Sequence, residues 1–189
     1  MCPAPAKTSD QEIVAAARRI VAEQGADALS MQSVADEVGV RAPSLYKRFP
    51  SRDALLDAVA HQGFEELRAR LVKSVHALQG GPALAAMAKA YRDFAKRSPR
   101  LYRLLFTQRS EAADLAAARA NAAAPLLGVL ETLISRPTHR LPAARLLTAF
   151  LHGFVSMEIE GAFKLGGDVS SAFEYGLAKV ISALSDTAD

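Results

Sequence analysis

The sequence predicts an all-α protein. Aromatic residues make up only 6% of the 189 residues and Trp is absent, whereas Ala is abundant, and this composition favours helices over strands. Apolar residues recur at helical spacing through most of the chain, and glycine or proline separates the resulting segments. With 50% of its residues apolar, the chain can form a buried core between these helices.

Charge and cysteine content indicate the cellular compartment more clearly than the function. The net charge is only +3, and residues 1–52 carry seven basic and six acidic side chains, so total charge does not indicate nucleic-acid binding. The lone Cys2 excludes an internal disulfide and fits a reducing cytoplasm. The amino terminus is short and broken by proline, unlike a signal peptide, and the charge-free stretch Leu146–Met157 is shorter than the roughly 20 residues that span a bilayer. We therefore expect a cytoplasmic protein without a membrane partner.

The first predicted helix begins at Ser9, because Glu12 three residues later completes a capping box. Its inner face is apolar and consists of Ile13, Val14, Ala17, Ile20 and Val21. Gly25 is expected to end the helix, since glycine readily adopts the conformation that follows a last helical turn. This helix would pack across the next two to complete a three-helix head.

Two short helices around a glycine follow in the stretch Ser30–Arg52. Ser30 can cap the first helix, whose apolar residues fall on one face. Gly39 stands where a left-handed residue would end that helix. The second helix starts after Arg41 and tolerates Pro43 in its first turn, because first-turn amides have no helical partner.

The second short helix has one apolar and one cationic face. Its inward positions are Ala42, Leu45 and Phe49, its outward positions are Pro43, Ser44, Lys47 and Arg48, and Tyr46 lies at the margin. The chain carries four basic residues and no acidic one from Val38 to Arg52, so the preceding Asp36 and Glu37 must be turned away from any polyanion. This arrangement describes a helix-turn-helix with a recognition helix, although an ordinary helical hairpin with a solvated basic face has the same pattern.

The same stretch resembles the DNA-binding signature of the tetracycline-repressor (TetR) family of transcriptional regulators. In that signature a capped helix, Gly-Val, a short helix with Leu-Tyr-x-x-Phe and then Ser-Lys/Arg-x-x-Leu follow in order. The corresponding residues are Gly39-Val40, Leu45–Phe49 and Ser51–Leu55. Three positions depart from the commonest residues, with Ser30 in place of Thr, Pro43 in place of Gly and Arg52 in place of Lys. Serine still caps, proline suits a first turn and arginine keeps the charge, so the resemblance stands.

The resemblance implies a transcriptional regulator, most often a repressor, that binds double-stranded DNA as a symmetric dimer. Two recognition helices would then enter successive major grooves of a near-palindromic operator, about 34–36 Å apart. Phosphate contacts are expected from Ser30, Ser44, Tyr46, Lys47, Arg48 and Arg52. Candidates for the base edges are Gln32, Arg41, Pro43 and again Lys47 or Arg48, with Ala42 on the same segment. Residues 1–52 would form the DNA-binding domain and residues 53–189 a regulatory domain for effector binding and dimerisation.

A long fourth helix joins the predicted head to the rest of the chain. Ser51 caps it and Asp53 lies near its positive end. Its apolar face is expected to continue as far as the break at Gly80–Pro82. The helix is therefore the natural mechanical link between the two predicted domains.

Further helices are expected over 83–97, over 100–107 and from Glu111 onward, where the sequence is rich in Ala. Pro125 should kink or split the Ala-rich helix. A loop is expected over Ser135–Pro142.

The carboxyl-terminal part of the chain predicts a dimer. Leu146–Met157 contains no charge, and a helix that is apolar on nearly all sides must be buried on nearly all sides. One side can face its own domain, and the other requires a partner. Together with the last helix, Val169–Leu184, it would form a four-helix interface between two chains. We therefore predict a two-fold homodimer through residues 141–164 and 169–185.

Leu151-His152-Gly153 and the following Met157–Gly161 are similar to the regulatory domain of TetR-type regulators that is named for a Trp-His-Gly pattern, with the Trp missing. A buried histidine such as His152 is more often a hydrogen-bonded core residue than a ligand, and the functional alternative is a polar contact to an effector or across the dimer.

The resemblance also implies a small-molecule effector bound between the fourth helix and residues 84–163. The candidate pocket residues are Phe64, Leu67, Met87, Tyr91, Phe94, Tyr102, Phe106, Phe150, Phe154 and Met157. Such residues at helical spacing also describe plain core packing. The scarcity of charge among them suggests an apolar effector.

No catalytic, metal or cofactor site is expected. The four histidines are spread without a ligand-spaced pair, and no phosphate-binding loop, dinucleotide-binding glycine pattern or nucleophile elbow occurs. Two other classes stay open beside the regulator. A helical carrier or sequestering protein for a hydrophobic molecule would need the pocket but not the basic segment, whereas an architectural or interaction protein would bind DNA without a cavity.

Overall fold

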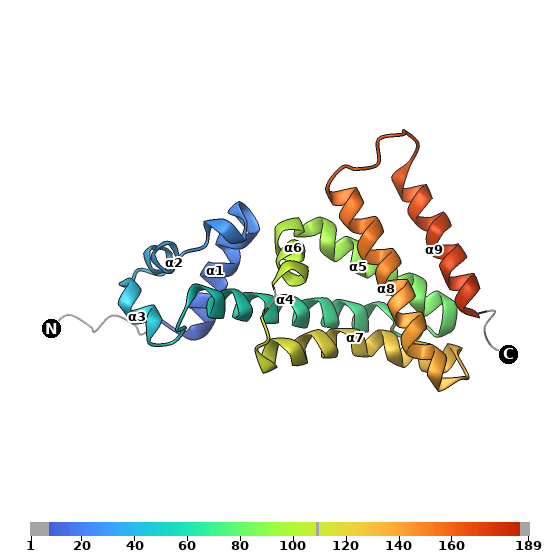
Figure 1. The fold of residues 1–189 in the computed structure, drawn as a ribbon, viewed down its shortest axis with the longest axis horizontal. Coiled ribbons are helices and arrows are strands. Elements are labelled where there is room, and N and C mark those ends of the chain that lie inside the picture. Colours follow the sequence, from blue (N-terminus) through green and yellow to red (C-terminus); the bar gives the residue numbers. More distant parts are fainter. Residues whose placement is uncertain (1–7, 109, 186–189) are drawn as a thin grey trace. The chain divides into compact units, whose positions relative to one another are not determined.

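The computed structural model describes residues 8–108 and 110–185, and these residues fold into helices without a strand (Figure 1). In chain order the elements are α1 (Asp10–Gln24), the short 3-10 helix η1 (Ala26–Ala28), α2 (Met31–Glu37), α3 (Ala42–Tyr46), α4 (Arg52–Ser74), α5 (Gly80–Arg97), α6 (Pro99–Thr107), α7 (Ala113–Leu133), α8 (Pro137–Ile159) and α9 (Val169–Ser185). The predicted all-α class is confirmed. None of the described helices is both long and apolar enough to cross a membrane. Cys2, which suggested a reducing compartment, lies outside the described residues.

The described residues form two compact units. The first contains the chain up to Phe64 together with Ser98–Ala118, and so combines α1 to α3, the start of α4, α6 and the start of α7. The second contains Glu65–Arg97 and the chain from Arg119 onward, which includes α5, α8 and α9. The boundary predicted between residues 52 and 53 lies between two functions, DNA binding and regulation. The division into compact units does not test it. In the packing, α6 belongs with α1.

The first unit is centred on α1 and its neighbours. The predicted capping box is confirmed, since the Glu12 amide donates to Ser9 Oγ at 3.2 Å and the Ser9 amide donates to Glu12 Oε2 at 2.7 Å. The apolar face predicted for this helix is buried. Gly63 of α4 lies close to α6, because a Cβ atom at this position would be 2.7 Å from Leu105 Cδ2. A Cβ atom here would require Leu105 to shift, and glycine permits the approach without that movement.

The second unit packs α5 against α8 and α9. Phe173 of α9 is buried, and its ring centroid lies 6.0 Å from that of Phe150 and 5.3 Å from that of Phe154, both on α8. The guanidinium carbon of Arg92 on α5 lies 4.6 Å from the centre of the Phe173 ring. A cation over an aromatic face is stabilising in such a partly desolvated place.

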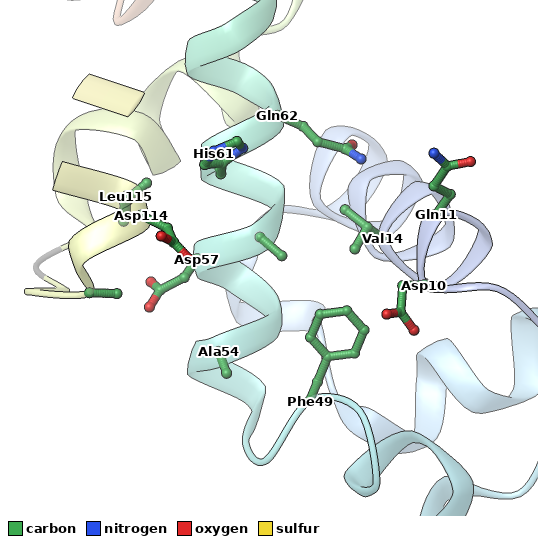
Figure 2. A pocket seen from close by; sticks show the side chains of 12 residues that line it. Asp10, Gln11, Val14, Phe49, Ala54, Asp57, His61, Gln62, Asp114 and Leu115 are labelled. Atoms are coloured by element: carbon green, nitrogen blue, oxygen red, sulfur yellow. The ribbon is translucent and has the colours of Figure 1, made fainter. Parts of the chain in front are cut away.

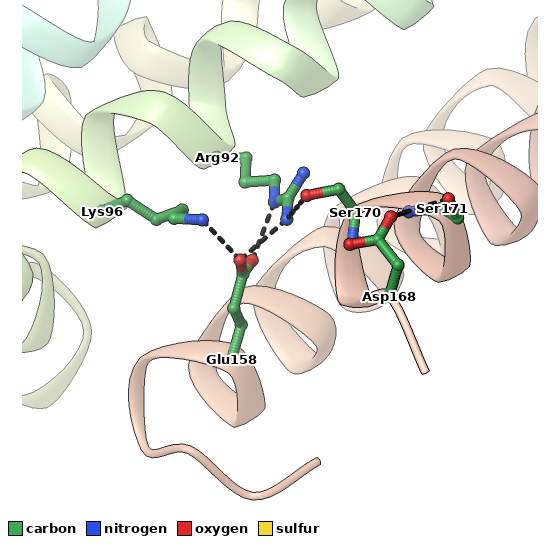
Figure 3. A network of polar contacts seen from close by, with 6 residues as sticks. All are labelled: Arg92, Lys96, Glu158, Asp168, Ser170 and Ser171. Atoms are coloured by element: carbon green, nitrogen blue, oxygen red, sulfur yellow. Dashed lines mark hydrogen bonds and ion pairs between the residues drawn. The ribbon is translucent and has the colours of Figure 1, made fainter. Parts of the chain in front are cut away.

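A polar network fastens the same three helices (Figure 3). Arg92 Nη2 and Lys96 Nζ, both from α5, lie 2.7 and 2.6 Å from Glu158 Oε1 near the end of α8. Arg92 Nη2 also donates to the Ser170 hydroxyl at the start of α9, at 3.1 Å. Hydrogen bonds from Arg92 hold the pKa of the Glu158 carboxyl below its ordinary value.

The fourth helix is shorter than predicted. It was expected to reach Gly80, but α4 ends at Ser74. The Ser74 hydroxyl donates to the Leu71 carbonyl at 2.7 Å, a local bond that competes with helix continuation. Three residues later Ala77 has φ +60, which takes the backbone out of the helical region. Val72 is exposed, so the apolar face ends with Leu71.

Two prolines lie inside helices. The predicted loop Ser135–Pro142 is wrong in extent, because α8 starts at Pro137 and contains Pro142. A proline just after the first turn removes a single backbone bond, here the one to the Thr138 carbonyl, and the helix tolerates the loss. Pro125 does not split α7, which continues through it from Ala113 to Leu133.

Candidate nucleic-acid interface

The cap of α2 fixes the start of the candidate interface. Ser30 has extended backbone angles, and its hydroxyl accepts a hydrogen bond from the Ser33 amide at 2.9 Å. Ser33 Oγ in turn accepts from the Ser30 amide at 3.0 Å. The two serines form a reciprocal capping box, which confirms the predicted cap.

The turn between α2 and α3 depends on Gly39. Its φ is +70, the left-handed region that the sequence predicts here. No heavy atom lies within 4 Å of a Cβ built at this glycine, so the backbone angle and not crowding selects the residue. After the turn the Val40 amide donates back to the Ala35 carbonyl at 2.9 Å. This bond satisfies one of the last carbonyls of α2.

α3 presents most of its predicted outer positions to solvent. Leu45 is 1% exposed and holds the helix to the head, while Ala42 and Phe49 are half-buried. The helix is short, but the Phe49 amide still donates to the Leu45 carbonyl at 2.9 Å and continues the turn. The exposed side chains of this segment are Arg41, Pro43, Ser44, Tyr46 and Lys47.

The cations of the segment have different surroundings. Arg41 and Lys47 form no ion pair with any residue in the described ranges, and both are exposed. Arg48 is half-buried, and its Nη1 lies 2.7 Å from Asp10 Oδ1 in the first turn of α1. The predicted contact residue Arg48 therefore braces α3 against α1.

Arg52 differs most from its predicted role. Its Nε donates to the Leu29 carbonyl at 2.8 Å and its Nη2 donates to the Ala26 carbonyl at 2.6 Å. Both acceptors belong to the connection between α1 and α2. The guanidinium is thus engaged inside the first unit, whereas the sequence led us to expect it on a DNA phosphate.

The two carboxylates of α2 have partners within the head, a cation for Glu37 and a neutral amide for Asp36. Glu37 Oε1 lies 2.7 Å from Arg19 Nε of α1, and Asp36 Oδ1 accepts from Gln32 Nε2 at 2.6 Å. The ion pair with Arg19 reduces the repulsion that Glu37 would exert on phosphate. The contact with Asp36 occupies the side-chain amide of Gln32, which was predicted to contact a base edge.

An open hollow of about 530 Å³ lies in the first unit, alongside α4 (Figure 2). Val14 and Phe49 contribute apolar surface on one side, and Asp57 and Asp114 lie near each other on the other side. Asp57 accepts hydrogen bonds from Gln108 and Ser110, so its carboxylate anchors the chain that leads into α7. None of the ten predicted effector residues lines this hollow.

The predicted effector residues divide between the two units. Phe64, Tyr102 and Phe106 lie in the first unit, where Tyr102 and Phe106 have ring centroids 4.9 Å apart. The second unit holds Leu67, Met87, Tyr91, Phe94, Phe150, Phe154 and Met157. Sequence reasoning left out Phe163, whose ring centroid lies 4.8 Å from that of Phe154. The pocket stays a prediction.

His152 is half-buried on α8, and burial lowers the pKa of its imidazole below the ordinary value. The side chain is therefore mostly neutral near pH 7.

The predicted dimer helices each have a buried and an exposed face. On α8 the residues Leu147, Leu151 and Val155 are buried, whereas Leu146 is 50% exposed. On α9 Tyr175 is 68% exposed. Large apolar side chains that remain in solvent on two packed helices are typical of an interaction surface.

A capped helix, a left-handed glycine and a short exposed helix followed directly by Lys47 form a helix-turn-helix. This motif is typical of DNA-binding proteins. Residues 13–59 match the family model described as bacterial regulatory proteins, tetR family, and residues 84–180 match the tetracyclin repressor-like C-terminal domain.

Comparisons with individual proteins agree with these family matches. The uncharacterized HTH-type transcriptional regulator Rv0681 of Mycobacterium tuberculosis is 31% identical over 160 residues, which cover 83% of this chain and 73% of that protein. A protein with unknown function from Rhodococcus sp. RHA1 has the same fold, with a TM-score of 0.84, 24% identity and coverage of 98% of this chain and 100% of that one. A TetR variant from Acinetobacter baumannii AYE, solved in complex with minocycline, has a TM-score of 0.69, 22% identity and coverage of 97% and 99%.

The chain belongs to the TetR family of bacterial transcriptional regulators. It is a DNA-binding regulator and not an enzyme. The further resemblance of Leu151-His152-Gly153 to the Trp-His-Gly type of regulatory domain stays a prediction.

Proposed function

We propose that the protein is a ligand-responsive repressor, released from a near-palindromic operator by a small apolar effector. DNA binding places its action in the compartment that holds the bacterial chromosome, the cytoplasm. The observation that carries the proposal is the exposed face of α3, where Lys47, Tyr46 and Ser44 point away from the head while Leu45 anchors the helix.

The proposed DNA contacts fall into two groups. Lys47, Ser44 and Tyr46, with the Ser30 cap at the start of α2, would bind phosphates and fix the register of the helix on the duplex. Arg41, Pro43 and again Lys47 or Arg48 are candidates for the base edges. Gln32 would have to leave Asp36 to join them. Because phosphate contacts release counterions, operator binding should weaken steeply as salt rises.

The proposed active form is a homodimer through residues 141–164 and 169–185. The exposed apolar positions on α8 and α9 support it, since a partner with the same surface would remove them from water. Two heads then bind two half-sites, and their spacing decides whether both can bind at once.

The proposed effector is a small apolar molecule that binds in the predicted regulatory domain, residues 53–189. Minocycline bound to the Acinetobacter relative supports a small-molecule effector as a class, without identifying it for this chain. An effector that prefers the wrongly spaced conformer by about 1–3 kcal/mol would weaken operator binding by roughly 5–150-fold.

The test combines two measurements on the full chain. A thermal-shift screen of lipophilic small molecules identifies binders, and fluorescence anisotropy then follows a duplex that the protein selects from a random-sequence pool. We expect at least one binder to raise the dissociation constant for the selected duplex at least about fivefold. Selection of no duplex would contradict DNA binding, and a bound ligand with no effect on the duplex would contradict the regulatory part alone.

A control variant distinguishes an effector that binds away from the DNA surface from a ligand that blocks this surface directly. Lys47→Ala should weaken binding of the selected duplex without changing the thermal shift that the effector causes, because Lys47 is exposed on α3 in the first unit. Loss of both responses in this variant would mean that the ligand binds at the DNA surface.

A further inference from the structure

We infer that Arg52 is a positioning residue for DNA recognition, which acts through the connection between α1 and α2 and not through a phosphate. It is the first residue of α4, and its half-buried guanidinium donates to the Leu29 and Ala26 carbonyls at 2.8 and 2.6 Å. Leu29 immediately precedes Ser30, the cap of α2. One side chain therefore connects the start of α4 to the start of the helix-turn-helix.

The acceptors explain why a cation is required at this place. The last turn of α1 carries no basic residue, so no side chain of that turn balances the partial negative charge of the terminal carbonyls. Arg52, at the start of α4, places a positive charge on two carbonyls of the connection that follows this turn. Arg100 of α6 acts at the same end, since its Nη1 donates to the Ala22 carbonyl at 3.4 Å.

The geometry favours arginine over lysine. Nε and Nη2 belong to one rigid fork and reach two carbonyls that are three residues apart in the chain. A lysine carries the same charge, but its single ammonium on a flexible stem lacks this fixed two-point geometry. If Arg52 instead met a phosphate, lysine would serve nearly as well.

The position of α2 and α3 depends on this contact. α2 packs against α3, and α3 is followed directly by the exposed Lys47. A loose α1–α2 connection would let the recognition segment sample orientations that do not fit the major groove. Affinity for a specific duplex would then fall more than affinity for random DNA, because only the specific complex requires accurate placement of base contacts.

The decisive variant is Arg52→Lys, with Arg140→Lys as its matched control. Arg140 Nε likewise donates to a backbone carbonyl, that of Ile134 at 3.1 Å, but it lies in the second unit. Both variants keep the charge and lose the arginine fork. Fluorescence anisotropy on the selected duplex and on a random duplex, over a series of salt concentrations, compares them with wild type at a temperature where circular dichroism shows all chains folded.

We expect Arg52→Lys to lower affinity for the selected duplex about tenfold, the effect typical of one charge-assisted hydrogen bond, while affinity for the random duplex changes little. The slope of log affinity against log salt should stay that of wild type. Lys47→Ala should reduce this slope by roughly 0.9 for each phosphate that the protein no longer neutralises. Arg140→Lys should leave both duplexes and the slope unchanged.

Hydrogen exchange supplies a readout that does not require DNA. In Arg52→Lys the amides of η1 and α2 should exchange faster, while those of α9 should not. Wild-type affinity in Arg52→Lys, or a reduced salt slope in Arg52→Ala equal to that of Lys47→Ala, would overturn the inference in favour of a phosphate contact. The inference rests on DNA binding by the family, and failure of the wild-type chain to select any duplex would count against that function and not against the role of Arg52.

Discussion

Glu158 shows how single charged residues stabilise the second unit. Its side chain is 12% exposed, and two cations from α5 approach the same carboxylate (Figure 3). The bonds from Arg92 lower the pKa of Glu158, and the same bonds raise the pKa of the Arg92 guanidinium. A carboxyl whose folded-state pKa is lowered contributes stability above its unfolded pKa of about 4.3, and this contribution is lost as pH falls through the lower folded value.

The substitution Glu158→Gln should therefore destabilise the protein most at neutral pH. We expect a loss of about 1–2 kcal/mol in the free energy of unfolding at pH 7, less than for a fully buried pair because water reaches Lys96. The difference from wild type should shrink below about pH 4, where the wild-type carboxylate is itself protonated. Urea unfolding of the variant and of wild type, at pH 7 and below about pH 4, measures this difference in the free energy of unfolding. Glu131→Gln on the exposed surface of α7 is the control and should give no difference at any pH.

At the scale of elements, the contact of α4 with α6 depends on a missing side chain. Gly63 brings Leu105 and Leu101 of α6 against the backbone of α4, within 2.7 and 3.4 Å of where a Cβ would stand. Both leucines are buried and have little room to move away. A glycine inside a helix otherwise lowers stability, so this one is explained by close packing.

Gly63→Ala should thus destabilise the first unit even though alanine is the better helix former. Overpacking costs about 1–3 kcal/mol, which outweighs a gain in helix propensity of up to about 1 kcal/mol. Gly128→Ala in α7 is the matched control, because no heavy atom lies within 4 Å of its Cβ position. It should raise the thermal midpoint, whereas Gly63→Ala lowers it. A stabilised Gly63→Ala would show that Leu105 reorients without strain.

At the scale of the whole molecule, the exposed faces of α8 and α9 predict assembly. Leu146, Gly153 and Met157 lie on one exposed face of α8, at spacings of seven and four residues. Tyr175 is exposed on α9, which packs against α8. The glycine leaves room for the backbone of a partner helix to approach closely.

Gly153→Arg should convert the predicted dimer into a monomer. A single chain tolerates the change, because no heavy atom lies within 4 Å of the Cβ position, but a partner helix would meet a buried charge. Gly128→Arg adds the same charge at an equally open position on α7 and should leave the dimer intact. Light scattering after size exclusion at micromolar concentration distinguishes the two. A wild-type monomer, or equal behaviour of both variants, would contradict the proposed interface.

The sequence by itself determined the helices and the helix-turn-helix, because their signals are local. Ser9 meets Glu12 and Ser30 meets Ser33 within three residues, and Gly39 is required by its own backbone angle. The resemblance to the TetR family rests on residues of the same short stretch. Local signals were less reliable where two of them conflict. Apolar spacing favours a helix beyond Ser74, whereas the Ser74 side chain bonds to the backbone and α4 ends there.

Only the tertiary structure decided what each cation does. Arg48 meets Asp10 across 38 residues, Arg52 meets carbonyls 23 and 26 residues away, and Arg19 meets Glu37 across 18. No periodicity or spacing specifies such pairs, because their geometry exists only after α1, α2 and α4 have packed. Charge sign is written in the sequence, whereas the partner of a charge is set by the fold.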